Sequence, residues 1–162
     1  MNEAKDWIEK LEMQPHPEGG FFKETYRSDE LEKFDGFIGS RNISTAIYFM
    51  ITQGNFSAFH RIRSDEMWHF YDGSPIEIIA ISPDGKLTTH TLGIDLNDGQ
   101  LPQATVAAGS WFASRIADEG AYALAGCTVA PGFDFQDFEL AERVKLIEKY
   151  PKHEAIIRQL TR

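Results

Sequence analysis

The sequence is poor in cysteine and contains no long apolar run. Its single cysteine, Cys127, cannot form an internal disulfide, so a disulfide-stapled scaffold is excluded. No window approaches the roughly 20 apolar residues that a membrane-spanning helix needs. Residues 1–13 are amphipathic and acidic and lack the apolar core of a secretory signal peptide. We therefore expect a cytoplasmic protein.

Positive charge is also scarce. The chain has 16 Lys and Arg against 25 Asp and Glu, which gives a net charge of −9. Nucleic-acid backbones and anionic membrane surfaces are bound mainly through Lys and Arg. The composition therefore predicts neither a nucleic acid nor a membrane as partner.

Aromatic and β-branched residues are plentiful, with 12 Phe, 5 Tyr and 3 Trp among 162 residues. This length predicts one domain spanning residues 1–162, with a sizeable core. Short runs of such residues alternate with Gly-, Pro- and Asp-containing turns, which predicts an all-β sandwich or barrel. The predicted strands are residues 21–27, 43–51, 56–62, 67–71, 76–81, 87–92, 104–107, 111–115 and 121–129.

Short helices are expected near both ends. Apolar residues at helical spacing predict helices at residues 3–13 and 137–150, and the apolar stripe of the second comprises Leu140, Val144 and Ile147. The polar, Gly-containing stretch 28–41 is predicted to be a long surface loop and a candidate mobile lid.

The segment from Gly54 to Gly73 is the most informative part of the chain. It has the pattern of a strand, a tight polar turn and a second strand. Strand side chains alternate, so His60 and Ile62 share one face, and Glu66, Trp68 and Phe70 share a face of the returning strand. The sequence therefore predicts an imidazole and a carboxylate close together inside an aromatic wall. His69 and Tyr71 lie on the opposite face unless a β-bulge re-aims the strand.

This segment resembles the first motif of the cupin superfamily, G-x5-H-x-H-x3-E-x6-G. The matching residues are Gly54, His60, Glu66 and Gly73, but Ile62 stands where the family has its second metal-binding His. In the region of the second motif, Gly109 is retained and Phe112 replaces a further His. The resemblance implies a jelly-roll barrel, or double-stranded β-helix, and a homodimer paired through its sheets.

Three more blocks resemble one small cupin branch of unassigned function: PHPEGG at 15–20, ETYRS at 24–28 and GCTVAPGFDFQDFEL at 126–140. In outline this branch is similar to the metal-free dTDP-sugar 3,5-epimerases. The resemblance implies a small-molecule pocket and a metal-independent isomerase or epimerase acting on a carbohydrate-like or carbonyl metabolite. Two alternatives stay open: a non-catalytic metabolite-binding module, and a metal-dependent oxygenase or isomerase.

The candidate residues follow from these patterns. The proton-transfer candidates are His60, Glu66, Tyr26 and Tyr71, and the ligand-binding candidates are Glu18, Glu24, Trp68, His69, Phe70 and Arg115. If a divalent metal binds weakly, its ligands would be His60, Glu66 and His69. The metal-independent isomerase or epimerase and the binding module require no cofactor. The competing structural interpretation makes His16 and Glu18 ordinary turn residues, His60 a satisfied core histidine and Arg115 a solvated strand end.

Overall fold

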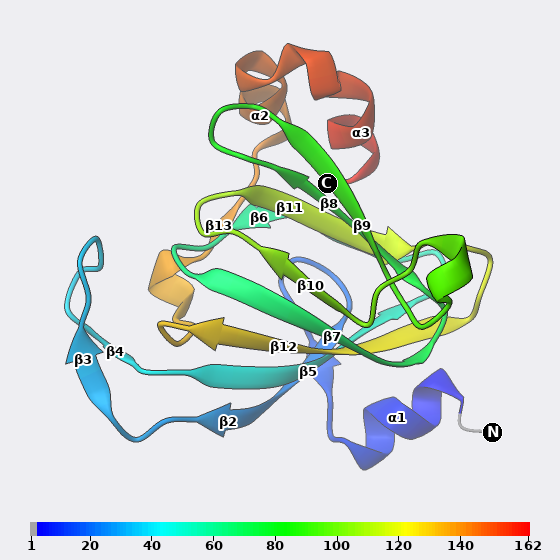
Figure 1. Cartoon of the computed structure of the whole chain (residues 1–162), viewed down its shortest axis with the longest axis horizontal. Coiled ribbons are helices and arrows are strands. Elements are labelled where there is room, and N and C mark those ends of the chain that lie inside the picture. The colour runs from blue at the N-terminus through cyan, green and yellow to red at the C-terminus, as the bar shows by residue number, and fades with distance from the viewer. Residues whose placement is uncertain (1–2) are drawn as a thin grey trace.

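Two antiparallel sheets face each other in a jelly-roll arrangement, seen in a computed structural model that describes residues 3–162 (Figure 1). The larger sheet has six strands, in the order β1 (Gln14–Pro15), β2 (Phe21–Arg27), β5 (Thr45–Thr52), β12 (Tyr122–Ala130), β7 (Asp65–Gly73) and β10 (Gln103–Val106). The smaller has five, in the order β13 (Glu139–Leu140), β6 (Phe56–Arg61), β11 (Trp111–Ile116), β8 (Ile76–Ile81) and β9 (Leu87–Leu92). The predicted all-β class with short terminal helices is confirmed.

The remaining elements cover or extend these sheets. A hairpin of β3 (Leu31–Lys33) and β4 (Ser40–Asn42) projects at the left of the view (Figure 1). The helices are α1 (Ala4–Lys10), α2 (Arg143–Lys149) and α3 (Glu154–Gln159), with 3₁₀ turns η1 (Leu96–Asp98), η2 (Phe135–Asp137) and η3 (Pro151–His153). Within residues 3–162, no helix has the length and apolar character needed to cross a membrane.

Strand alternation divides the apolar residues into three buried clusters. The main core lies between the sheets and includes Phe49 and Trp68 of the larger sheet and Ile78 of the smaller. A second cluster, around Phe59 and Leu146, packs α2 and α3 on the outer face of the smaller sheet. A third packs α1 against the outer face of the larger sheet. The larger sheet is therefore held from both sides.

The structure corrects two predicted elements. Residues 28–41 contain the β3–β4 hairpin instead of a continuous loop, and Arg41 within it is buried. The C-terminal helix begins at Arg143 instead of Asp137, because Glu139–Leu140 first pairs with the free edge of β6 as β13. Because the helix starts later, its buried face differs from the predicted apolar stripe: Leu146 is buried, whereas Val144 is 67% exposed.

Candidate active site

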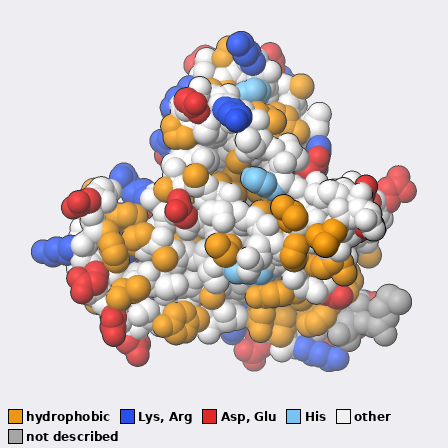
Figure 2. Space-filling model, in the orientation of Figure 1, with side chains coloured by type: hydrophobic (Ala, Val, Ile, Leu, Met, Phe, Trp, Pro, Cys, Tyr) orange, Lys and Arg blue, Asp and Glu red, His pale blue; other side chains and the backbone are white. Residues whose placement is uncertain are grey.

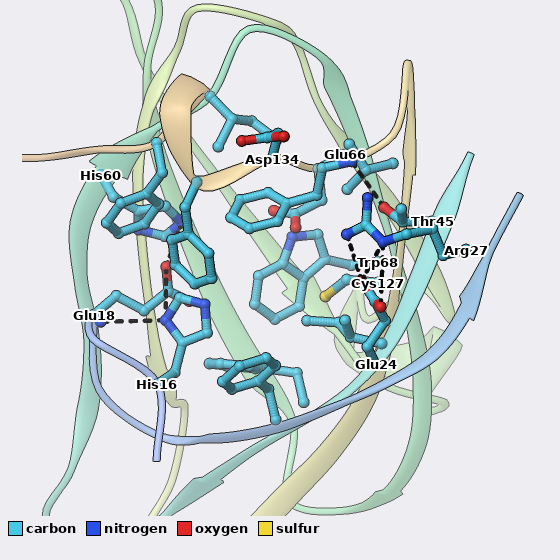
Figure 3. A pocket seen from close by; sticks show the side chains of 18 residues that line it. His16, Glu18, Glu24, Arg27, Thr45, His60, Glu66, Trp68, Cys127 and Asp134 are labelled. Atoms are coloured by element: carbon cyan, nitrogen blue, oxygen red, sulfur yellow. Dashed lines mark hydrogen bonds and ion pairs between the residues drawn. The ribbon is translucent and has the colours of Figure 1, made fainter. Parts of the chain in front are cut away.

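A cavity of about 280 Å³ opens between the sheets at one end of the core (Figure 3). Its walls come from β2, β5, β6, β7 and β12 and from two loops, residues 16–18 and 133–138. Phe49, Trp68 and Cys127 belong both to this wall and to the main core. Pockets that bind small molecules combine such apolar walls with a few polar groups.

The first polar group is a buried pair of His60 and Glu18. His60 Nε2 lies 2.8 Å from Glu18 Oε2, and both side chains are almost inaccessible to solvent. Glu18 reaches His60 because the loop lies tightly against β6: the Ala58 amide donates to the Glu18 carbonyl at 2.7 Å. Gly19 permits this approach, since its φ is +109° and a Cβ there would collide with the Phe56 carbonyl.

The hydrogen bonds of His60 define its charge. Nδ1 lies 2.7 Å from the Ala58 carbonyl oxygen, which can only accept, so Nδ1 carries a proton. Nε2 faces a carboxylate and donates as well. Burial alone lowers the pKa of His60, but the Glu18 carboxylate outweighs it and the net pKa is raised. Burial raises the pKa of Glu18, and the His60 charge more than reverses this, leaving that pKa lowered. His60 is thus a cation with both nitrogens occupied.

Glu66 provides a carboxyl group of a different kind. It is 9% exposed, and its Oε2 has no hydrogen-bond partner among residues 3–162. Burial raises the pKa of Glu66 to about 7; the His60 charge and the neighbouring Trp68 indole N–H oppose the rise, and the Glu18 charge adds to it. Trp68 lies two residues along the same strand face, with its indole N–H beside the Glu66 carboxyl, but no hydrogen bond of normal geometry is formed by its Nε1 within the described chain (Figure 3). Two unpartnered buried polar atoms in one cavity mark the place where a ligand would be recognised.

His16 adds a neutral donor. The backbone amide of Glu18 donates to its Nδ1 at 3.2 Å, so the proton of the neutral ring resides on Nε2. Burial lowers the pKa of His16; Glu18 partly opposes this and the His60 charge reinforces it. The ring contacts Phe22 edge-on, with 4.7 Å between centroids. Its Nε2 faces the interior of the cavity (Figure 3).

Loop 133–138 closes the cavity with aromatic rings. Phe133 and Phe135 meet edge to face at 4.9 Å between centroids, and Phe138 stacks on His60 at 5.5 Å. The loop is anchored to the β3–β4 hairpin by a buried two-point ion pair of Arg41 and Asp137, with Nε–Oδ2 of 2.7 Å and Nη2–Oδ1 of 2.8 Å.

The exposed side of the cavity carries charged groups. Arg27 donates to Glu24 at 3.1 Å through Nε and to the Asn42 Oδ1 at 2.8 Å through Nη1. Asp134 accepts the Gln136 amide at 2.9 Å, and this hydrogen bond lowers the pKa of Asp134 despite partial burial, with Arg41 and Arg27 contributing. Glu24 and Asp134 are therefore at the rim, and Glu66 at the inner wall.

The structure does not bring every predicted residue to the cavity. Tyr26 is 55% exposed on the outer face of the sheet, because β2 contains a bulge between Glu24 and Tyr26 that gives the inward position to Arg27. Tyr71 is 52% exposed, on the same outward face as His69, although β7 has a bulge between Phe70 and Asp72. The β2 bulge therefore reverses the expected alternation at Tyr26, whereas Tyr71 lies on the outward face that regular alternation predicts.

His69, Phe70 and Arg115 also lie away from the cavity. The β7 bulge comes after His69, so His69 keeps its outward direction and contacts the Thr128 hydroxyl at 3.0 Å. Phe70 packs against the main core beyond the cavity. Arg115 faces outward and pairs with Glu77 at 2.6 Å.

The expected metal ligands therefore do not assemble. His69 points away, Ile62 lines the cavity in place of a histidine, and the Phe112 ring lies 4.1 Å from that of His60. Across residues 3–162, no group of three or more His, Cys, Asp or Glu side chains is arranged to hold a metal ion. These residues do not fit the three- or four-ligand centre that zinc or non-haem iron needs.

Several cavity residues were not predicted as site residues. They include His16, Phe22, Arg27, Phe133, Asp134, Phe135 and Phe138. The available signal was the density of phenylalanine in a segment that follows Pro131–Gly132, since loops seldom carry large apolar residues unless these are buried or contact a ligand.

Comparison with known proteins yields consistent matches. The sequence model of the family described as Cupin superfamily (DUF985) matches residues 5–141. An uncharacterized protein of Saccharomyces cerevisiae, YML079W, is 33% identical over 135 residues, or 75% of this chain and 67% of the yeast protein. Protein SO0799 from Shewanella oneidensis is 43% identical, with a TM-score of 0.91 and coverage of 100% and 99% of the two chains.

Two further solved structures resemble this chain. A hypothetical protein from Leishmania major is 36% identical, with a TM-score of 0.93 and 99% coverage of both chains. Oxalate decarboxylase from Bacillus subtilis shares the fold alone, with 10% identity, a TM-score of 0.57 and coverage of 94% of this chain and 38% of that enzyme.

Proposed function

Because the chain belongs to the cupin superfamily, in the family described as DUF985, we propose that it binds a small metabolite in its barrel and moves a proton at a carbon atom of that metabolite, as an isomerase or epimerase does. The substrate class is a small carbonyl compound. The observation that carries the proposal is the carboxyl of Glu66, which is buried in the cavity wall, unpartnered at Oε2 within residues 3–162, and has a pKa raised to about 7.

Glu66 acts as the proton carrier. A general base works best when its pKa lies near the working pH, and burial supplies that match here. The ionised carboxylate takes a proton from the carbon next to the carbonyl. The electron pair of that C–H bond forms a C=C bond, and the carbonyl oxygen gains negative charge. Glu66 then returns the proton. In an isomerisation of a hydroxy-carbonyl compound the proton goes to the former carbonyl carbon while the neighbouring hydroxyl proton moves to the enolate oxygen; in an epimerisation it goes back to the same carbon after the planar intermediate has turned its other face to Glu66.

Two neutral donors support the carbonyl oxygen. His16 Nε2–H and Trp68 Nε1–H belong to the same cavity, and neutral N–H donors stabilise a developing oxyanion without forming an ion pair in the ground state. His60 serves as a positioning residue, because both its nitrogens are bound and it fixes Glu18 and the loop that carries His16.

Deuterium exchange tests this function without a known substrate. The protein is incubated in D2O with a low-molecular-mass metabolite extract and is then removed. The extract alone is returned to H2O, which removes deuterium from N and O but not from carbon, and it is examined by mass spectrometry. We expect one compound to retain a carbon-bound deuterium after incubation with the wild-type protein and none after incubation with Glu66→Gln. Glu32→Gln, the same change on the exposed hairpin, is the matched control.

The same experiment decides between an enzyme and a binding module. A cavity that binds a metabolite without turning it over would also give a compound that co-purifies with the protein. If such a compound shifts the Trp68 indole signal but gains no deuterium during prolonged incubation, the chain is a metabolite-binding module and the proton-transfer proposal is wrong.

A further inference from the structure

The charged groups of the cavity are arranged in a way that restricts the ligand. His60 is saturated by Glu18 and by the Ala58 carbonyl, and Arg27 is held by Glu24 and Asn42. Among the described residues that line the cavity, these are the cationic side chains, and each is already paired. An anionic ligand would lose its hydration shell without gaining a free cation.

The acidic groups point to the same restriction. Asp134 stands at the rim, and it has no ion-pair partner within 4 Å in the part of the chain that the structure describes. Glu18 and Glu66 lie deeper. A carboxylate or phosphate entering the cavity would approach these groups, and like charges at close range oppose binding strongly.

The unpartnered atoms define what a ligand must offer. Trp68 Nε1 is a donor and Glu66 Oε2 belongs to a carboxyl group; both side chains are at least nine-tenths buried. A molecule with a carbonyl-type acceptor and an N–H or O–H donor satisfies both. Rings of Phe22, Phe49 and Phe135 line the remaining space and favour a flat molecule. The volume of about 280 Å³ leaves room for on the order of ten non-hydrogen atoms.

We infer that the cavity takes an uncharged, flat molecule that carries a carbonyl-type acceptor beside an N–H or O–H donor, and that it rejects carboxylates and phosphates. This inference rests on the proposed function for its site and narrows the substrate class. It excludes organic acids and sugar nucleotides as ligands, because their anionic groups find no free cation in this wall.

Three isosteric probes test the selection by charge: benzamide, benzoate and benzamidinium, which are neutral, anionic and cationic. Each is titrated against ¹⁵N-labelled protein while the indole N–H signal of Trp68 is followed, with Trp68→Phe used to assign that signal. For ligands of this size, a dissociation constant on the order of 1 mM is expected. We expect benzamide to bind at least about tenfold more tightly than benzoate at pH 6 and pH 8.

The cationic probe reports on Glu66 separately. The titratable groups near Glu66 are His60 from β6, Glu18 from the loop and Cys127 from β12. As the pH rises through about 7, Glu66 becomes ionised, so benzamidinium should gain affinity relative to benzamide. Glu66→Gln should remove this gain and reduce the disadvantage of benzoate, whereas Glu32→Gln should change neither.

Opposite results would overturn the inference. Benzoate binding as tightly as benzamide, or no shift by any probe up to about 10 mM, contradicts it. Neither result bears on turnover, which the deuterium exchange measures independently. If the protein exchanged deuterium into an organic acid, the proposed function would be supported and the inferred selection against anions would be wrong.

Discussion

Glu66 sets a pH-dependent limit on the stability of the fold. Its pKa rises from an ordinary 4.5 to about 7 because the carboxyl is buried. The folded protein therefore binds this proton more tightly than the unfolded chain, so between these two values stability falls as the pH rises. A shift of this size in a fully buried group corresponds to about 3 kcal/mol.

Glu66→Gln should remove the loss of stability that accompanies ionisation of Glu66. We expect the free energy of unfolding of the variant to exceed that of the wild type by up to about 3 kcal/mol at pH 8 and to differ far less at pH 5, because only the ionised carboxylate is disfavoured by burial. Urea unfolding at the two pH values measures the difference, with Glu32→Gln as control. An equal difference at both pH values would show that Glu66 does not titrate as a buried acid.

At the level of individual residues, part of the site could be predicted from the sequence. Motif spacing placed His60, Ile62, Glu66 and Trp68 on the cavity wall, because regular alternation holds along those stretches. It paired His60 with Glu66, whereas the ion-pair partner in the structure is Glu18. That contact joins residues far apart in the chain, and it depends on how closely a loop can lie against a strand, which spacing does not encode.

Among the elements, the loop containing residues 15–20 depends most on a single backbone position. Gly19 has φ +109° and lies against the Phe56 carbonyl, and the Arg162 side chain donates to the neighbouring Glu18 carbonyl at 2.7 Å. Gly19 therefore lets the loop pack on β6, and Gly20, whose Cβ would meet the Met50 carbonyl, lets it pack on β5. Together they fix the placement of His16 and Glu18.

Gly19→Ala should therefore lower the free energy of unfolding by more than the strain of a positive φ alone would. Gly36 has φ +85°, and a methyl group added there would meet no atom within 4 Å, so Gly36→Ala provides the matched control for backbone strain. We expect about 1 kcal/mol of destabilisation for Gly36→Ala and at least about 2 kcal/mol more for Gly19→Ala, measured by urea unfolding. The Trp68 indole signal should move only in Gly19→Ala. Equal losses in the two variants would contradict this role of Gly19.

Element boundaries were predicted unevenly, for identifiable reasons. Turn residues between β-branched runs located most strands of both sheets. The hairpin within 28–41 was missed because its strands are short and polar, and its anchor is the distant Arg41–Asp137 pair. The bulge before Tyr26 inserts one residue, which no alternation pattern reveals, and so reversed the direction predicted for that side chain.

For the molecule as a whole, the outer face of the larger sheet is only partly covered. α1 packs on one end of it, while Tyr26, Met67 and Tyr71 remain exposed by 55%, 38% and 52%. Figure 2 shows apolar side chains gathered in the lower half of the view, near α1. A sheet face with exposed aromatic side chains is typical of a subunit interface.

We expect this face to pair two copies of the chain. Light scattering coupled to size exclusion should give a mass near twice the monomer mass of 18.4 kDa. Introducing charge at the face, with Met67→Glu and Tyr71→Glu together, should give the monomer mass, because two carboxylates would be buried without partners. Leu31→Glu, at an exposed apolar position on β3, should leave the dimer intact. A wild-type mass of 18.4 kDa at all concentrations would contradict the expectation.

Phe49 and Trp68 belong both to the hydrophobic interior and to the wall of the cavity. Any molecule that seats between them extends the packed interior, and occupancy then shifts the folding equilibrium by mass action. On the proposed function, fractions of a cell extract that contain the ligand should therefore raise the temperature of thermal unfolding, and ranking the fractions by this increase would locate the ligand before any reaction is known.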